Sequence, residues 1–311
     1  MILFPNAKIN LGLHVVGKRT DGFHDIETVF YPVGLCDILE IITVGEGETV
    51  FTSSGIPIPG PTASNLCIKA LNQLSSYIPH PTSHIPHPTS HILHPASHIP
   101  HPTTHNLHPA SHIPHPTTHN PPPLHIHLHK SIPMGAGLGG GSSDGAYTIK
   151  LVDKLFKLNL SMEQMEAIAR KLGSDCAFFI RNKPVLASGK GDQFSACSVD
   201  LSQYYIVVVK PDIHVATSDA YGMLTPEKPG KILPEILSQP IESWKNELVN
   251  DFEGAVFSRF PEIGKIKQKF YEKGALYASM SGSGSAVYGI FSEKPTVEGW
   301  FPGCFIWEGT L

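Results

Sequence analysis

Residues 132–147, IPMGAGLGGGSSDGAY, contain five glycines within seven consecutive positions. Glycine lacks a Cβ atom, so a run of this density lets the backbone turn tightly and lets its N–H groups approach a ligand closely. The residues that follow, Ser142, Ser143 and Asp144, are typical of a helix N-terminus, which leaves free N–H donors and the positive end of the helix dipole. The segment therefore predicts a turn into a helix that can hold a phosphate group.

Two well-known nucleotide-binding motifs fit this loop less well. Gly135, Gly137 and Gly140 satisfy the GxGxxG pattern of dinucleotide folds, but there the preceding strand is buried on both faces, whereas LHIHLHK alternates with histidine. A Walker A loop requires a lysine after the glycines, where this chain has Ser142. A triphosphate held by backbone N–H groups is the favoured ligand, and a tight capped turn without a ligand is the alternative.

A second glycine-serine loop, SMSGSGSAVYG, spans residues 279–289. Gly-Ser turns are common, so this loop alone is as readily a plain turn as a binding site. Together with the first loop it suggests two backbone cradles that face one polyanion.

The rest of the chain predicts a mixture of strands and helices. Alternating apolar residues predict strands at residues 7–19, 38–44, 124–130, 204–211, 276–281 and 286–292. Helical spacing predicts helices at residues 62–77, with Ser64 or Asn65 as the cap, 148–156, 161–173 and 261–274. Because the two types do not alternate regularly, the pattern favours an α+β fold over a doubly wound sheet.

Residues 78–119 form six heptads of the type IPHPTSH, which hold twelve of the eighteen histidines. Proline in every unit removes backbone donors, so neither a helix, a coiled coil nor a central strand is expected there. We interpret this histidine-proline array as a repeat-expanded surface excursion, with metal binding as the alternative.

Composition excludes several classes of protein. A net charge of −4 gives no basic footprint for nucleic acid, and no run of 18 apolar residues predicts a membrane span. The N-terminus has no signal-peptide pattern, and the five cysteines lack the close spacing of a zinc site or a disulfide framework. These features predict reduced thiols in the cytoplasm, and about 150 residues per domain gives two domains.

Three motifs together resemble those of the GHMP kinases, the superfamily of galactose, homoserine, mevalonate and phosphomevalonate kinases. They are PNAKINLGL near the N-terminus, PMGAGLGGGSSDGA and MSGSGSAVYG. The resemblance implies a two-domain α+β fold with ATP in the first glycine loop. An N-terminal ribosomal-protein-S5-like domain is expected over residues 1–155, interrupted by the array at 78–119, and a C-terminal ferredoxin-like domain over 156–311.

The run NAKINLGLHVVGKRTDGFHDIETVF, residues 6–30, is similar to the branch of these kinases that acts on a cytidine diphosphate ester of methylerythritol. This implies ATP-dependent phosphorylation of the 2-hydroxyl of that small molecule, in the non-mevalonate route to isoprenoids, with Mg²⁺ accompanying the nucleotide. A kinase of the homoserine or mevalonate type is the close alternative. A non-catalytic metal-binding or adhesive protein built around the array is the distant one.

The resemblance also implies roles for individual residues. Asp175, in GSDCAFF, matches the acid that takes the hydroxyl proton, although Cys176 and Ala177 depart from the usual letters, and Lys8 matches the lysine beside that acid. Substrate contacts are implied for Asn10, Phe23, His24 and Tyr221, the last three against the cytidine ring. Without the resemblance, Asp175 would be a turn acid and Lys8 a solvated strand lysine.

Contacts with ATP are implied for the first glycine loop and for two residues of the adenine pocket. The residues are Asn65, Lys130, Pro133, Met134, Gly135, Ala136, Gly137, Leu138, Gly139, Gly140, Gly141, Ser142 and Ser143. No residue is assigned to a metal, and Asp144 is either a helix cap or a metal-side group. The three histidines of residues 124–130 are expected to form a solvated strand face.

Overall fold

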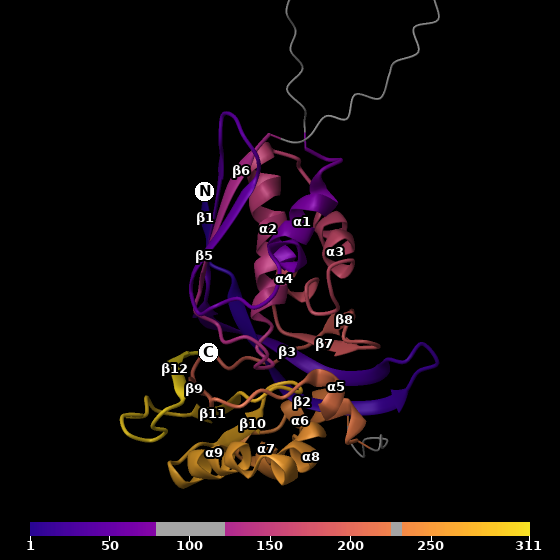
Figure 1. Ribbon diagram of the computed structural model, residues 1–311. Coiled ribbons are helices and arrows are strands. Elements are labelled where there is room, and N and C mark those ends of the chain that lie inside the picture. The colour runs from indigo at the N-terminus through magenta and orange to yellow at the C-terminus, as the bar shows by residue number, and fades with distance from the viewer. Residues whose placement is uncertain (79–121, 225–231) are drawn as a thin grey trace, which may run out of the picture.

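Three four-stranded sheets organise the part of the chain that this computed structural model describes, residues 1–78, 122–224 and 232–311. Figure 1 shows two of them in separate halves of the molecule, with the long strands β2 and β3 running between the halves. Strands and helices do not alternate regularly along the chain, so the predicted α+β class is confirmed. The histidine-proline array lies outside the described residues apart from its first residue, Ile78, which is buried.

The first sheet has the strand order β1-β4-β6-β5. Its strands are β1 (Ile2–Leu3), β4 (Ile38–Thr43), β5 (Val50–Gly55) and β6 (Leu124–Lys130). The alternating sequence of β6 forms the predicted strand, antiparallel to β4 and parallel to β5. Its leucines and isoleucine pack into the core with helices α1 and α2, while its histidines occupy the opposite face and contact Thr52 and Ser54 of β5.

Four helices accompany this sheet. They are α1 (Leu66–Leu74), α2 (Gly140–Phe156), α3 (Met162–Arg170) and α4 (Phe178–Arg181). Asn65 caps α1 by accepting a hydrogen bond from the Cys67 N–H, and Ser161 and Gln164 form a capping box on α3. Helix α2 begins at Gly140, two residues before the serines expected at its N-terminus. The apolar spacing is recognisable only from Thr148 because the first two turns carry glycine and serine.

The second sheet has the order β2-β3-β7-β8. Its strands are β2 (Asn6–Lys18), β3 (His24–Cys36), β7 (Val185–Ser188) and β8 (Gln193–Ala196). Residues 6–15 of β2 are all buried because other elements cover the strand on both faces. A buried β2 explains how Lys8 and Asn10 come to lie inside the protein.

The third sheet, in the C-terminal half, has the order β10-β11-β9-β12. Its strands are β9 (Tyr205–Lys210), β10 (Tyr277–Met280), β11 (Val287–Phe291) and β12 (Phe305–Thr310). Its helices are α5 (Thr217–Gly222), α6 (Leu233–Leu237), α7 (Trp244–Glu247), α8 (Phe252–Arg259) and α9 (Pro261–Glu272). A 3-10 turn at Ile241–Ser243 precedes α7, and another at Thr62–Ser64 precedes α1 in the N-terminal half.

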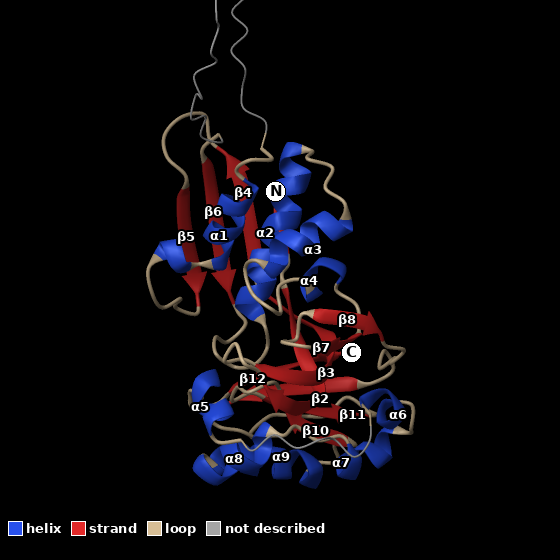
Figure 2. Cartoon of the chain, turned by 90° about the vertical axis from the view of Figure 1, so that its right-hand side faces the viewer, coloured by secondary structure: helices blue, strands red, loops and turns tan. Residues whose placement is uncertain are grey.

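Each face of the third sheet has its own apolar core. Ile206 and Val208 pack toward β2 and β3, whereas Val207 and Val209 pack on α8 and α9, which lie beneath the sheet in Figure 2. The sheet is therefore a layer between the long hairpin and the helices. The turn that connects β10 to β11, at one end of these strands, contacts the first glycine loop.

Residues 156–196 pack with the N-terminal half. Strand β7 pairs with β3, and α3 contacts both α2 and α4. The boundary that the resemblance implies after residue 155 falls at the end of α2, where residues 157–161 form a tight turn in which Lys157 and Asn159 have positive φ angles. We propose that the boundary between the two domains lies between β8 and β9.

No helix within the described residues is long and apolar enough to cross a membrane. All five cysteines are free, as their spacing predicts.

Candidate active site

Two cavities flank the first glycine loop. The larger, about 760 Å³, lies between the halves and is lined by Lys8, Asp175, Tyr221 and the glycines at 137 and 139. The smaller, about 360 Å³, lies on the side of β5 and α1 and is lined by Asn65, Lys130, Met134, Gly141 and Asp144. The loop therefore separates two binding spaces and contributes backbone to both.

A lysine and an aspartate from distant parts of the sequence meet in the larger cavity. The Lys8 Nζ atom lies 3.5 Å from Asp175 Oδ2 and donates a hydrogen bond to Asn10 Oδ1 at 2.6 Å. Burial lowers the pKa of Lys8, and the charge of Asp175 opposes that lowering. The Asp175 side chain is 32% exposed, so its carboxylate can reach a ligand in the cavity.

The fold fixes this pair from two sides. Lys8 lies near the start of β2, and its backbone N–H donates to Leu138 O of the glycine loop at 2.9 Å. Asp175 lies in the turn between α3 and α4, just before the buried Cys176. The strand, the loop and the turn thus hold a cation and a carboxylate beside the loop backbone.

The two glycine-serine loops touch each other through their backbones. Ser281 Oγ donates to Gly137 O at 2.9 Å, and the Ala286 N–H donates to Ala136 O at 3.2 Å. A Cβ atom on Gly137 would lie 1.8 Å from Ser281 O, so only glycine fits there. Gly282 and Ser283 of the second loop also line the larger cavity.

The smaller cavity contains a buried ionic triad. Lys130 Nζ donates to Asp144 Oδ2 at 2.7 Å and also to Asp37 Oδ2. Burial disfavours the charged form of Lys130, but the two carboxylates together outweigh this effect and raise its pKa. Burial raises the pKa of Asp144. Asp144 Oδ1 is buried without a hydrogen-bond partner among the described residues, so this triad leaves one acceptor unused at the cavity.

The residues expected to contact ATP differ in whether their side chains or only their backbone atoms can reach a ligand. Asn65 and Met134 line the smaller cavity with Lys130, and Gly141 lines it with its backbone. Leu138 and Ala136 are buried in the apolar core, so only their backbone atoms are available to a ligand. Of the remaining loop residues, Gly135 is exposed. The others are buried or half-buried; these are Pro133, Gly140, Ser142 and Ser143.

The aromatic residues expected on the substrate side meet at the mouth of the larger cavity. Phe23 is 58% exposed, with Lys190 Nζ 4.9 Å from the centre of its ring. His24 and Tyr221 stack directly on each other, with ring centres 4.6 Å apart and planes at 18°. A base between two rings needs them about 7 Å apart, so this pair leaves no gap for one.

Lys190 is a further cation of the larger cavity that the motifs do not indicate. It lies in SGKGDQ, between Gly189 and Gly191, which both have positive φ angles. A lysine between two glycines in a turn is the signal that could have pointed to it. Lys18 lines the same cavity, so a ligand there meets three lysine side chains.

Comparisons with known proteins show to which family the chain belongs. Residues 107–183 match the model of the GHMP kinases N terminal domain and residues 232–299 that of the GHMP kinases C terminal domain. The chain is 47% identical to a 4-diphosphocytidyl-2-C-methyl-D-erythritol kinase of Parabacteroides distasonis, with 100% of both chains covered. It is 49% identical to the protein of that name from Cytophaga hutchinsonii, over 95% of this chain and 94% of the relative.

Solved structures share the fold. A crystal structure of 4-(cytidine 5'-diphospho)-2C-methyl-D-erythritol kinase superimposes with a TM-score of 0.72 at 28% identity, covering 100% of this chain and 98% of the other. The mevalonate kinase of Methanococcus jannaschii has a TM-score of 0.63 at 13% identity, covering 99% and 97% of the two chains. The second likeness extends to the fold alone.

Proposed function

Because this chain belongs to the 4-diphosphocytidyl-2-C-methyl-D-erythritol kinases, a branch of the GHMP kinases, we propose that it phosphorylates the 2-hydroxyl of that substrate with ATP. The observation that carries the proposal is the Lys8–Asp175 pair in a cavity beside the glycine loop. Transfer of a phosphoryl group to an alcohol requires two aligned substrates and stabilised charge more than covalent chemistry.

The acceptor occupies the larger cavity in this proposal. Its hydroxyl lies beside Asp175, which accepts the proton as the oxygen attacks the γ-phosphorus. The bond from the γ-phosphorus to the bridging oxygen breaks, and ADP is the leaving group. Lys8 binds the same hydroxyl oxygen and stabilises the negative charge that develops on it. Lys190 and Lys18 attract the diphosphate of the substrate.

The nucleotide occupies the smaller cavity and crosses the first glycine loop. Free N–H groups at the start of α2 and the positive end of its dipole hold the phosphates. The base lies among Asn65, Met134, Lys130 and Asp144, which line this cavity.

Mg²⁺ is proposed to enter with ATP. Residues 1–78, 122–224 and 232–311 contain no cluster of three or more His, Cys, Asp or Glu side chains that could hold a metal. Mg²⁺ needs no such cluster, since it keeps waters and takes oxygen atoms from nucleotide phosphates and one or two carboxylates. Asp144, whose Oδ1 atom has no hydrogen-bond partner among the described residues and which lines the smaller cavity, is a carboxylate of this kind, and bound Mg²⁺ would neutralise phosphate charge.

The cytosine ring is proposed to stack on Phe23 and Tyr221. Since His24 covers one face of Tyr221, the base displaces that imidazole, which then offers hydrogen bonds to the edge of the base. Homoserine and mevalonate have no ring for such a stack, so these aromatic residues favour the cytidine substrate. The five free cysteines fit a reducing compartment, and we propose that the enzyme works in the cytoplasm.

Replacing Tyr221 by leucine is expected to raise the KM for the cytidine substrate about ten-fold. Stacking of a base on an aromatic side chain contributes about 1–3 kcal/mol, and about 1.4 kcal/mol corresponds to a factor of ten. The KM for ATP should stay within about two-fold, because Tyr221 does not line the smaller cavity. Steady-state kinetics with each substrate varied in turn measures both constants.

Phe4→Leu is the matched control, because Phe4 is 59% exposed and lines neither cavity. An unchanged KM for the cytidine substrate in Tyr221→Leu would refute the stacking role of this residue.

The site of phosphorylation is tested on the isolated product. Phosphorus and carbon NMR should show the new phosphorus coupled to the methyl-bearing carbon of the erythritol part. Three-bond coupling of the new phosphorus to a hydrogen on the carbon that carries the phosphate would refute the assignment of the 2-hydroxyl, because the methyl-bearing carbon has no hydrogen.

A further inference from the structure

The turn of the second glycine-serine loop, residues 281–285, connects β10 to β11. It is closed by hydrogen bonds from the Ser281 N–H to Ala286 O at 2.9 Å and from the Gly284 N–H to Ser281 O at 3.4 Å. Gly282 and Ser283 line the larger cavity, and among the described residues no acceptor is found for their backbone N–H groups. Gly282 has a φ angle of +57°, which glycine adopts readily. Free N–H donors stabilise transition-state charge only when they are held in place before the reaction.

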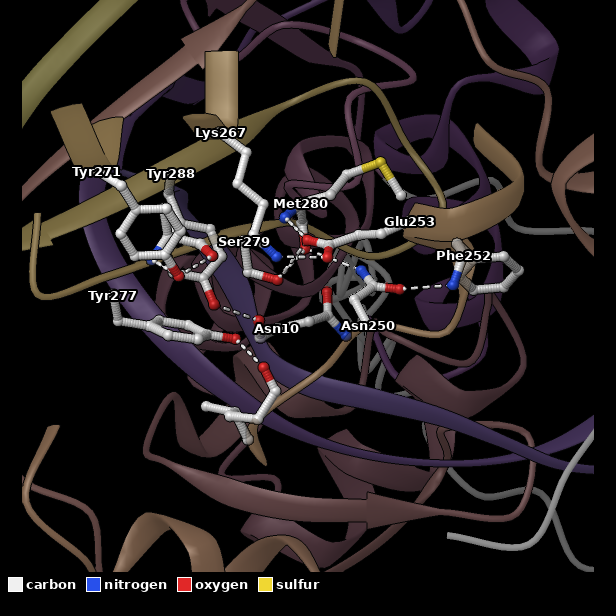
Figure 3. A network of polar contacts seen from close by, with 12 residues as sticks. Asn10, Asn250, Phe252, Glu253, Lys267, Tyr271, Tyr277, Ser279, Met280 and Tyr288 are labelled. Carbon is white, nitrogen blue, oxygen red and sulfur yellow. Dashed lines mark hydrogen bonds and ion pairs between the residues drawn. The ribbon is translucent and has the colours of Figure 1, made fainter. Parts of the chain in front are cut away.

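The side chain of Asn250, just before α8, forms hydrogen bonds with Met280 and Phe252, as Figure 3 shows. Its Nδ2 group donates to Met280 O and to Gly282 O, both at 2.8 Å. Its Oδ1 atom accepts from the Phe252 N–H at 3.0 Å. The side chain is buried, so one amide fixes the carbonyl groups on both sides of Ser281 without contact with the solvent.

Glu253, one turn further on, fixes the strand end that leads into the loop. Its Oε1 atom accepts from the Met280 N–H at 2.8 Å and from Ser279 Oγ at 3.0 Å. Its other oxygen accepts from Lys267 Nζ at 2.5 Å. The end of β10 is thereby tied to α8 and α9 (Figure 3).

The same segment is also tied to the strand that carries Lys8. The Leu13 N–H donates to Val249 O and the Asp251 N–H donates to Leu13 O, both at 2.9 Å, so the residues around Asn250 run beside β2. Asn250 thus lies at the junction between the second loop and the strand of the proposed catalytic lysine. A shift of this junction would move the free N–H groups relative to Lys8 and Asp175.

We propose that Asn250 is a positioning residue for phosphoryl transfer. The Gly282 carbonyl shares a peptide plane with the Ser283 N–H, so by holding that carbonyl Asn250 directs the Ser283 N–H into the cavity, where it donates to the phosphoryl group in transfer. The hydrogen bond to Met280 O fixes the segment that leads into the loop. Asn250 itself contacts neither substrate, since it does not line either cavity. This inference rests on the proposed function, because it requires a phosphoryl group in the larger cavity.

Asn250→Asp tests the inference, because aspartate keeps the size of the side chain and the acceptor for the Phe252 N–H. It replaces the donor that faces the two carbonyls by an oxygen. We expect kcat to fall about 10- to 100-fold near neutral pH, less than the loss from removing a donor outright, with KM values for both substrates within about three-fold.

The pH dependence separates positioning from a general loss of structure. When the carboxyl group introduced by Asn250→Asp is protonated, it can again donate to a carbonyl, and burial raises the pKa of such a group. The deficit in kcat relative to the wild type should therefore shrink as the pH falls.

The matched control is Asn159→Asp, because Asn159 is an exposed asparagine that donates to Lys157 O at 3.0 Å, and its kinetics should equal those of the wild type. If Asn250→Asp does not fold, Asn250→Ala replaces it and should show the loss in kcat without the pH dependence. A folded variant with wild-type kcat, or with the loss confined to KM, would overturn the inference. A wild-type enzyme that does not phosphorylate the cytidine substrate would instead refute the proposed function.

Discussion

Asp175→Asn is expected to lower kcat about 10²- to 10⁴-fold, the usual contribution of a general base. Asparagine keeps the shape of the side chain but cannot accept the hydroxyl proton. The affinity for ATP should stay within a few-fold, because Asp175 lies in the larger cavity and does not line the smaller one. Single-turnover kinetics measures the chemical step, and calorimetry with a non-hydrolysable ATP analogue measures nucleotide binding.

Asp212→Asn provides the control for this variant. Asp212 is an exposed aspartate that lines neither cavity, so both its kinetics and its nucleotide affinity should match the wild type. If Asp175→Asn retains more than about half of the wild-type kcat, Asp175 is not the base.

Gly137→Ala is expected to reduce kcat/KM about 100-fold and to destabilise the fold by about 3 kcal/mol. The added methyl group would lie 1.8 Å from Ser281 O, a backbone atom, so the two loops must separate. The φ angle of +81° also costs an alanine about 1–2 kcal/mol, and overpacking costs about 1–3 kcal/mol. A misplacement of about 1 Å can lower the rate of an aligned reaction by about 10².

Gly17→Ala is the matched control for steric effects. Gly17 has no positive φ angle, and no heavy atom lies within 4 Å of a Cβ atom built there. Its free energy of unfolding should change by less than about 0.5 kcal/mol. Denaturant unfolding and kcat/KM are measured for both variants, and equal behaviour of the two would show that the contact between the loops is unimportant.

Local sequence patterns were sufficient to predict several elements. Strand β6 and helix α3 lie where their apolar spacing places them, and the glycine-rich turn into α2 is confirmed. These elements depend on interactions between residues close in sequence. Ser142, Ser143 and Asp144 placed the start of α2 within two residues, although Gly140 and Gly141 give no helical periodicity.

The arrangement of the proposed site depended on contacts that no local pattern encodes. Lys130 was expected in the adenine pocket, and it does line the smaller cavity, but its charge is already paired with Asp37 and Asp144. Asp37 lies in the turn between β3 and β4, and only the fold brings it to Lys130. The direct stack of His24 on Tyr221 is likewise a tertiary contact, between the start of β3 and α5.

The roles of Lys8 and Asp175 came from the resemblance to a family, because each residue alone has an ordinary structural explanation. Their separation of 3.5 Å supports the proposed pairing. Asn250 was not indicated by sequence, since an asparagine before a helix is expected to be a cap.

A coupled assay of ADP release with a panel of alcohols tests the central claim most directly. The full chain is given ATP, Mg²⁺ and, in parallel, 4-diphosphocytidyl-2-C-methyl-D-erythritol, homoserine or mevalonate. We expect kcat/KM for the cytidine substrate to exceed that for the other two by at least about 10³-fold, because only it fills the lysine- and aromatic-lined cavity. Equal or greater kcat/KM for homoserine or mevalonate would contradict the account.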